Sequence, residues 1–352
     1  MKTRDGRRLP SLLGAGPLAF AVIFATVILP ADGQPTNTVI ATVQLPSSLP
    51  FGIGVTPDNL YVYVIGNGAN ALFRLDTKTN AFENKSIGLG GNPQFLAFLS
   101  AGADVYVTNA ITPFDGTDAV PGTVSLISDG EKANPHLKET ITGMGKFAGP
   151  IAINPKGTQA WVGDYYEACC TVVDLKKNKA EPLPVQTGSG PTSVAFTPNG
   201  KCAYVTNYLD NTIVKINTAT QLIVGDPVAV GKGPRNVVIT PDGEKAYVTN
   251  QDGTVSVIDV ATNQVVTTVS VAASDPGYYQ GSALTPDGLY LYVGNQGAET
   301  VEMISTKIDK VVGNPVTVGS VPGIIAIAPN GKRAYVTNLY DATVSVIEIT
   351  GG

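Results

Sequence analysis

Histidine is almost absent from this chain, whose 352 residues include a single one, His136. Copper or zinc centres built on several imidazoles are therefore excluded. A Ser–His–Asp triad would depend on His136 alone, which follows the third strand of its repeat and so falls on the side away from the loops discussed below. No phosphate-binding loop or dinucleotide fingerprint occurs. The sequence therefore predicts neither catalytic residues nor a bound cofactor.

Charged residues are also scarce, at 14%, and the formal net charge is −5. Nucleic acids and anionic membranes attract basic surfaces, so neither is an expected partner. What the chain does contain is 43% hydrophobic residues, 39 Gly and 25 Pro. This composition is typical of many short strands joined by tight turns, and it is ample for a large core.

The first 33 residues have the layout of a secretory signal. A basic start, "MKTRDGRR", precedes the apolar run "LPSLLGAGPLAFAVIFATVILP", and the small residues of "ADG" follow. We expect cleavage near Gly33–Gln34, which would leave residues 34–352 as an extracytoplasmic protein, periplasmic or secreted. The apolar run could also span a bilayer, so an uncleaved anchor is the alternative.

One ten-residue pattern recurs along the rest of the chain. "PDGEKAYVTN" occupies 241–250, "PNGKCAYVTN" 198–207 and "PNGKRAYVTN" 329–338, and four weaker copies exist. The aromatic residue of the motif falls at Tyr63, Tyr106, Trp161, Tyr204, Tyr247, Tyr292 and Tyr335. A period in the low forties with short β-branched strands is the signature of a β-propeller with one four-stranded blade per repeat.

Seven repeats predict an all-β, seven-bladed propeller of antiparallel blades in residues 34–352. The last repeat stops one strand short, after "TVSVIEI" at 343–349. The missing strand is at the other end, because "TNTVIATVQL" at 36–45 is similar to "TNQVVTTVSV", the outer strand at 262–271. Pairing the N-terminal strand with the last blade would close the ring and cover two sheet edges.

The chain resembles the YVTN-family seven-bladed β-propeller proteins. The resemblance is carried by "YVTN" at 106–109, 204–207, 247–250 and 335–338, with "TVSVID"-like strands following, and it covers about 36–350. It implies the propeller fold, and for function we predict an exported, monomeric, non-catalytic binding module. Two alternatives come from related propellers: a lactonase-like or sugar-acid hydrolase that uses a divalent cation in the central cleft, and a periplasmic cofactor-handling propeller similar to haem d1 assembly proteins.

Departures from the repeat gather on one side of the ring, here called the loop face. It consists of the loops that precede each first strand and those that follow each second strand. The position that begins the first strand carries Gln94, Arg235 and Gln280, and Tyr279 replaces the usual Pro just before it. Arg235 and the nearby loop residue Lys146 could receive an anion. The alternative is that Arg235 pairs with Asp210 or Asp252.

The sequence "DYYEACC" at 164–170 places Tyr165, Tyr166 and Glu167 on the same face. Tyrosine offers apolar area and a hydroxyl, so this rim suits an envelope protein, a glycan or a small anionic ligand. The acidic residues near it, Asp164, Glu167 and Asp115, allow a Ca²⁺ site, because that cation needs only oxygen ligands.

Three cysteines remain, and an exported chain favours disulfides. Cys202 begins the second strand of its blade, far from the other two, and is predicted to be a free thiol. For the adjacent Cys169 and Cys170 we expect a vicinal disulfide.

Overall fold

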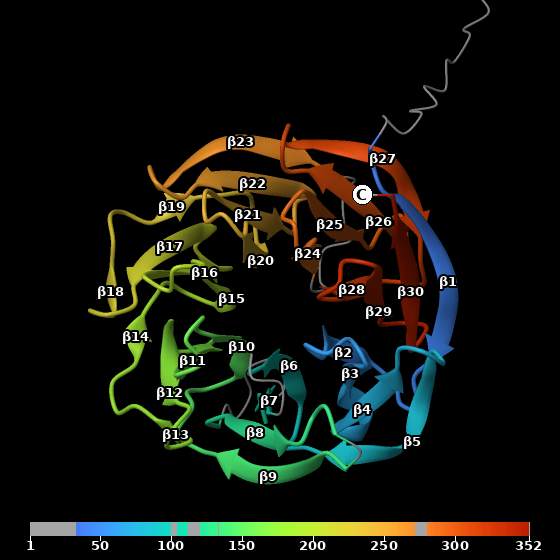
Figure 1. Ribbon diagram of the computed structural model, residues 1–352. Helices are drawn as coiled ribbons and strands as arrows, with labels where there is room; N and C mark the ends of the chain where they lie inside the picture. The colour runs from blue at the N-terminus through green and yellow to red at the C-terminus, as the bar shows by residue number, and fades with distance from the viewer. Residues whose placement is uncertain (1–32, 100–103, 112–119, 133, 272–279, 352) are drawn as a thin grey trace, which may run out of the picture.

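The computed structural model of the protein describes residues 33–99, 104–111, 120–132, 134–271 and 280–351. They form seven antiparallel sheets arranged as a ring around a central axis (Figure 1). The predicted all-β seven-bladed propeller is confirmed. No helix within the described residues is long and apolar enough to cross a membrane.

The blades follow one another along the chain, and each runs from the axis outward. The first blade contains β2 (Pro50–Val55), β3 (Tyr61–Gly66), β4 (Ala71–Asp76) and β5 (Ala81–Gly88), with a short 3-10 turn, η1 (Asn67–Ala69). The second contains β6 (Pro93–Phe98), β7 (Val105–Asn109), β8 (Thr123–Ser128) and β9 (His136–Ile141). The third contains β10 (Ala148–Ile153), β11 (Gln159–Asp164), β12 (Cys169–Asp174), β13 (Lys179–Ala180) and β14 (Val185–Gln186).

The remaining four blades repeat this order. The fourth contains β15 (Pro191–Phe196), β16 (Cys202–Asn207), β17 (Thr212–Asn217), β18 (Leu222–Ile223) and β19 (Val228–Ala229). The fifth contains β20 (Pro234–Ile239), β21 (Lys245–Asn250), β22 (Thr254–Asp259) and β23 (Gln264–Ser270). The sixth contains β24 (Ser282–Leu284), β25 (Tyr290–Asn295), β26 (Thr300–Ser305) and β27 (Lys310–Thr317), and the seventh β28 (Pro322–Ile327), β29 (Arg333–Asn338), β30 (Thr343–Thr350) and β1 (Thr36–Gln44).

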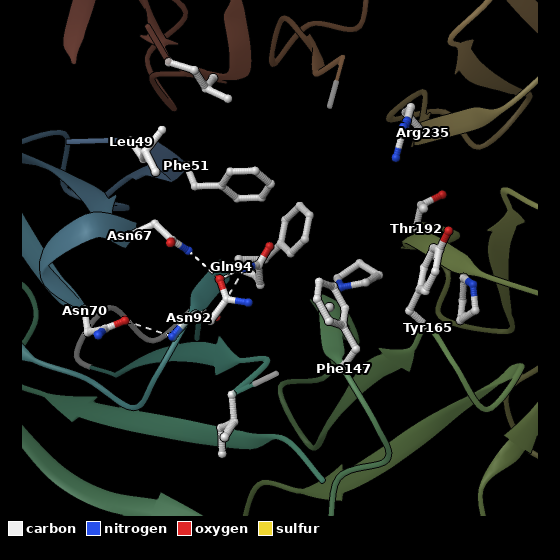
Figure 2. Close-up of a pocket in the computed structure, with 16 residues that line it drawn as sticks. Leu49, Phe51, Asn67, Asn70, Asn92, Gln94, Phe147, Tyr165, Thr192 and Arg235 are labelled. Carbon is white, nitrogen blue, oxygen red and sulfur yellow. Dashed lines mark hydrogen bonds between the residues drawn. The ribbon is translucent and has the colours of Figure 1, made fainter. Parts of the chain in front are cut away.

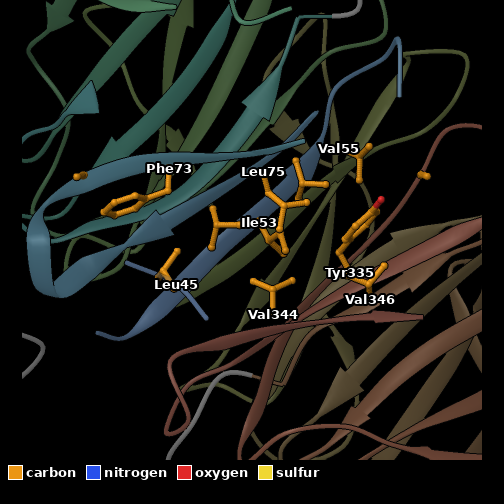
Figure 3. Packing of buried hydrophobic residues seen from close by; sticks show 12 residues of the cluster. Leu45, Ile53, Val55, Phe73, Leu75, Tyr335, Val344 and Val346 are labelled. Carbon is orange, nitrogen blue, oxygen red and sulfur yellow. The ribbon is translucent and has the colours of Figure 1, made fainter. Parts of the chain in front are cut away.

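The N-terminal strand closes the ring, as predicted. β1 pairs antiparallel with β30, from Thr36 opposite Thr350 to Gln44 opposite Thr343. Beyond β1, the buried Leu45 enters a cluster between the first and last blades that also contains Ile53 and Val344 (Figure 3). The two ends of the chain are therefore joined by a sheet ladder and by apolar packing.

The motif aromatics explain why the repeat is conserved from blade to blade within this chain. All seven are buried between neighbouring sheets. Several of their hydroxyls also reach the next blade: Tyr63 donates to the Gly130 carbonyl at 2.7 Å, and Tyr247 donates to Asp309 Oδ1 at 2.5 Å. Each motif tyrosine thus supplies apolar area, and several add a directed bond to the adjoining blade.

The outer strands of the third and fourth blades depart from the repeat, because each is split into two short pieces. The segments between the pieces are "EPLP" at 181–184 and "VGDP" at 224–227. Proline has no backbone N–H to give to the ladder, and the interrupted stretches contain Pro182 and Pro184 in the third blade and Pro227 in the fourth.

Candidate functional site

A cavity of about 530 Å³ opens on the loop face (Figure 2). Six of the seven blades contribute to its walls. The lining residues are Leu49, Phe51, Asn67, Asn70, Asn92, Gln94, Phe95, Ile111, Phe147, Gly149, Pro150, Tyr165, Pro191, Thr192, Arg235 and Leu339. The cavity is of a size that suits a drug-sized molecule.

Most of the wall is aromatic or aliphatic. Phe51 and Phe95 meet edge to face, with ring centroids 5.5 Å apart. On the third blade, Phe147 packs against Tyr165 at 5.9 Å and against Tyr166 at 5.7 Å. These contacts hold the rings in place, so the cavity offers a preformed apolar surface to a ligand.

Arg235 is the only charged side chain among the described residues that line the cavity. It is only 6% exposed, and its guanidinium carbon lies 4.0 Å from the centre of the Tyr208 ring. Gln251 Oε1 accepts a bond from the Tyr208 hydroxyl at 2.7 Å and one from Arg235 Nη2 at 3.5 Å. The stacked ring and the amide oxygen fix the guanidinium plane while its nitrogens point into the cavity (Figure 2).

The carboxylates that the sequence offered as partners for Arg235 bind backbone groups instead. Asp210 Oδ2 accepts the amide of Ser189 at 2.6 Å, and Asp252 Oδ2 accepts that of Lys232 at 2.7 Å. Each bond ties the loop after a second strand to the loop before the first strand of the same blade. These aspartates therefore order the loop face.

Side-chain amides line the part of the cavity formed by the first two blades. Asn92 Oδ1 accepts the amino groups of Asn67 at 2.8 Å and of Gln94 at 2.7 Å. Asn70 Oδ1 accepts the backbone amide of Asn92 at 2.8 Å. Figure 2 shows this group on the left, across the cavity from Arg235. In this article these four residues are called the carboxamide wall.

Three of the residues predicted from the sequence line the cavity: Gln94, Tyr165 and Arg235. Tyr166 stacks behind Phe147 and is 37% exposed. The other four predicted residues do not belong to the described lining. Lys146 and Glu167 are exposed loop residues, Gln280 is buried and donates to the Gly294 carbonyl at 2.8 Å, and Tyr279 lies outside the described residues.

Sequence reasoning missed Leu49, Asn92 and Phe147, although a signal for them exists. Each precedes the first strand of its blade with a left-handed backbone, at φ values of 54°, 53° and 57°. The fourth and fifth blades place Gly190 and Gly233 at this position, where glycine adopts the conformation without steric cost. A side chain there costs about 1–3 kcal/mol, and such strain concentrates at functional sites.

The predicted disulfide between Cys169 and Cys170 is wrong, because both are free thiols, as is Cys202. The two adjacent residues lie in β12, where successive side chains point to opposite faces of the sheet. Burial raises the pKa of the Cys169 thiol to about 12 and that of Cys170 well above its usual value. Both thiols therefore stay protonated and unreactive.

Asp164 stands where five other blades have the motif Asn, and its carboxyl is buried. Oδ1 accepts the amide of Gly145 at 2.9 Å, and Oδ2 accepts the Thr171 hydroxyl at 2.6 Å. Burial, reinforced by the negative charge of Glu167, raises the pKa of Asp164 to about 6. Within the described residues no group of three or more His, Cys, Asp or Glu could hold a metal ion, and Asp115 lies outside them.

Asp164→Asn should stabilise the protein in a pH-dependent way. Because folding raises the pKa of Asp164, its protonated form favours the fold, and this contribution is lost as pH rises from about 4 to about 6. The melting temperature of the variant should therefore exceed that of the parent by an amount that grows across this window and levels off above it. The plateau corresponds to on the order of 2–3 kcal/mol. Thermal melts from pH 4 to 8 measure it, and a constant difference would contradict the assignment.

Comparison with known proteins agrees with this fold. Residues 221–351 match a family model described as a lactonase, seven-bladed β-propeller. No curated protein sequence matches the chain. Among solved structures, Kuenenia stuttgartiensis hydrazine synthase is similar, with a TM-score of 0.74 and 21% identity over 88% of this chain and 98% of that one. The likeness is one of fold.

Proposed function

We propose that the protein binds a small ligand with an apolar body and an anionic group in the loop-face cavity. The observation that carries this proposal is the buried Arg235 at the edge of an aromatic cavity. The Tyr208 ring and the Gln251 amide oxygen, which hold the guanidinium in place, are neutral groups. A carboxylate would add a charge-assisted bond in surroundings of low dielectric constant, where such bonds are strong.

The neighbours of Arg235 support the same reading. Figure 2 shows Tyr165 and Thr192 on the same side of the cavity as Arg235, and the Thr192 hydroxyl donates to the Pro234 carbonyl at 2.7 Å. The positive charge of Arg235 opposes the rise that burial causes in the pKa of Tyr165, so the two groups interact. On the opposite side, Leu49 and Asn92 hold a left-handed backbone. A cavity of this kind selects a ligand by one ionic contact and by shape.

We also propose that the chain is a YVTN-type propeller that acts outside the cytoplasm. The four "YVTN" copies support the first statement, and the basic start and apolar run within residues 1–33 support the second.

Arg235→Met should abolish the preference of the cavity for anions. We expect the parent to bind 3-phenylpropionate more tightly than its uncharged amide, because only the acid forms a charge-assisted pair with Arg235. Such a pair contributes roughly 1.5–3 kcal/mol, so the variant should lose at least about tenfold in affinity for the acid and keep its affinity for the amide. Isothermal titration calorimetry measures both.

Lys146→Met is the matched control, because it removes the same charge from an exposed residue of the loop face outside the cavity lining. It should leave both affinities unchanged. Equal binding of acid and amide by the parent, or the same loss in both variants, would contradict the proposal. Thermal melts of each variant separate lost binding from lost folding.

Hydrolysis of a lactone is the second candidate, and the family match over residues 221–351 favours it. That reaction needs a group to activate water. The described residues that line the cavity include no carboxylate, histidine or cysteine. Ring opening of simple lactones, measured by the proton that it releases at constant pH, would support this candidate over binding alone.

A further inference from the structure

The carboxamide wall lies across the cavity from Arg235 and is not explained by an anion with an apolar body. Among the described residues, its hydrogen bonds use the amino groups of Asn67 and Gln94 but neither of their carbonyl oxygens. At Asn70, within the same part of the chain, they use the carbonyl oxygen but not the amino group. The wall therefore presents hydrogen-bond acceptors and a donor together, without a charge.

From this wall we infer that the ligand is the carboxy-terminal end of a peptide, or an acylated amino acid of the same chemistry. The inference rests on the proposed function, since it places the ligand carboxylate at Arg235. An amide group carries one N–H donor and one C=O acceptor, which match the mixed groups of the wall. Gln94 is only 7% exposed, so a bond to it would form away from bulk water.

The apolar residues between the two polar ends favour a peptide over an acidic sugar. Leu49, Ile111 and Leu339 are aliphatic, and Phe51 and Phe95 meet edge to face. A hydrocarbon side chain gains from burial against such surfaces, whereas the many hydroxyls of a sugar would lose their water without finding partners there. The cavity thus fits a terminal residue whose large apolar side chain, carboxylate and preceding amide branch from one Cα atom and contact the apolar walls, Arg235 and the carboxamide wall in turn.

A matched pair of small molecules tests this inference. N-acetyl-L-phenylalanine is 3-phenylpropionate with an acetamido group added beside the carboxylate. We expect the parent protein to bind N-acetyl-L-phenylalanine about tenfold more tightly, the effect of one or two additional hydrogen bonds. Acetyl-Ala-Phe with a free carboxylate should bind at least as tightly, and the same dipeptide with a terminal amide should bind at least tenfold more weakly.

Gln94→Met locates the source of this preference, because it keeps the length of the side chain and removes its amide. In this variant the preference for N-acetyl-L-phenylalanine over 3-phenylpropionate should fall to about twofold. A thermal melt of the variant checks that the cavity is folded. Gln264→Met, the same substitution on the exposed outer strand β23, should keep the full preference.

The possible outcomes separate this inference from the proposed function. If 3-phenylpropionate binds but the acetamido group adds nothing, the peptide inference is wrong and the proposed function stands. If glucuronate binds more tightly than N-acetyl-L-phenylalanine and loses affinity in Gln94→Met, the wall recognises hydroxyls, and the peptide inference is again wrong. If neither carboxylate of the matched pair binds, both proposals are wrong.

Discussion

A chain that begins at Ser47, and so lacks β1, should melt far below a chain that begins at Gln34. The lost strand supplies the ladder to β30, and Val43 and the buried Leu45 pack into the cluster between the first and last blades. Val39 packs into the cluster of the sixth and seventh blades. Burying a large apolar side chain contributes about 1.5–3 kcal/mol when complete, so the summed loss approaches the 5–15 kcal/mol that typically separates folded from unfolded protein.

The truncation should also change the solution behaviour of the protein, because it exposes the edge of β30. An uncovered strand edge pairs readily with other chains, so size-exclusion chromatography should show aggregates. Adding a peptide of residues 34–46 should restore the melting temperature in part, since it can reoccupy the same edge. A truncated chain that melts within a few degrees of the Gln34 chain would contradict closure of the ring by this strand.

The repeat made the ring predictable, because its seven copies report the same local packing seven times. Tyr247 and its equivalents are buried alike, and the N-terminal strand is recognisable from its likeness to the outer strand at 262–271. The interruptions at Pro182 and Pro227 were not foreseen, although proline is a known signal for them.

The cavity was predictable only in part. Arg235 is recognisable because it is the one charged residue at the start of a first strand. This departure can be read directly from the aligned repeats. Phe147 and Asn92 belong to different blades. That they line the same cavity depends on how six blades are arranged around it. Comparison of the blades would have found them, because each carries a side chain where the fourth and fifth blades have glycine.

The disulfide prediction failed for a related reason. Export and adjacency suggested that Cys169 and Cys170 were bonded, but both lie within a regular strand that points their side chains apart. The repeat as a whole sets the strand pairing. The adjacency of two cysteines in the sequence does not change it.

Tyr247→Ala should be among the most destabilising single substitutions in the protein. The ring is fully buried between the fifth and sixth blades, where it packs with Val257, Val293 and Ile304. Truncating a buried aromatic side chain leaves a cavity and costs about 3–5 kcal/mol. Loss of the hydroxyl bond to Asp309 adds to this, because a half-buried carboxylate oxygen loses a donor. Urea unfolding, followed by the fluorescence of Trp161 and by circular dichroism, measures the difference in free energy.

Two tyrosine-to-phenylalanine variants divide this cost into packing and hydrogen bonding. Tyr247→Phe keeps the ring and loses only the contacts of the hydroxyl, with Asp309 Oδ1 at 2.5 Å and with the Thr306 carbonyl at 3.4 Å, so it should destabilise by about 1–2 kcal/mol. Tyr204 occupies the same position in the fourth blade, but its buried hydroxyl has no hydrogen-bond partner among the described residues. Tyr204→Phe should therefore be neutral or should stabilise the protein, because it removes an unsatisfied polar group. If the two variants lost the same free energy of unfolding, the hydrogen bond between Tyr247 and Asp309 would not stabilise the contact between blades.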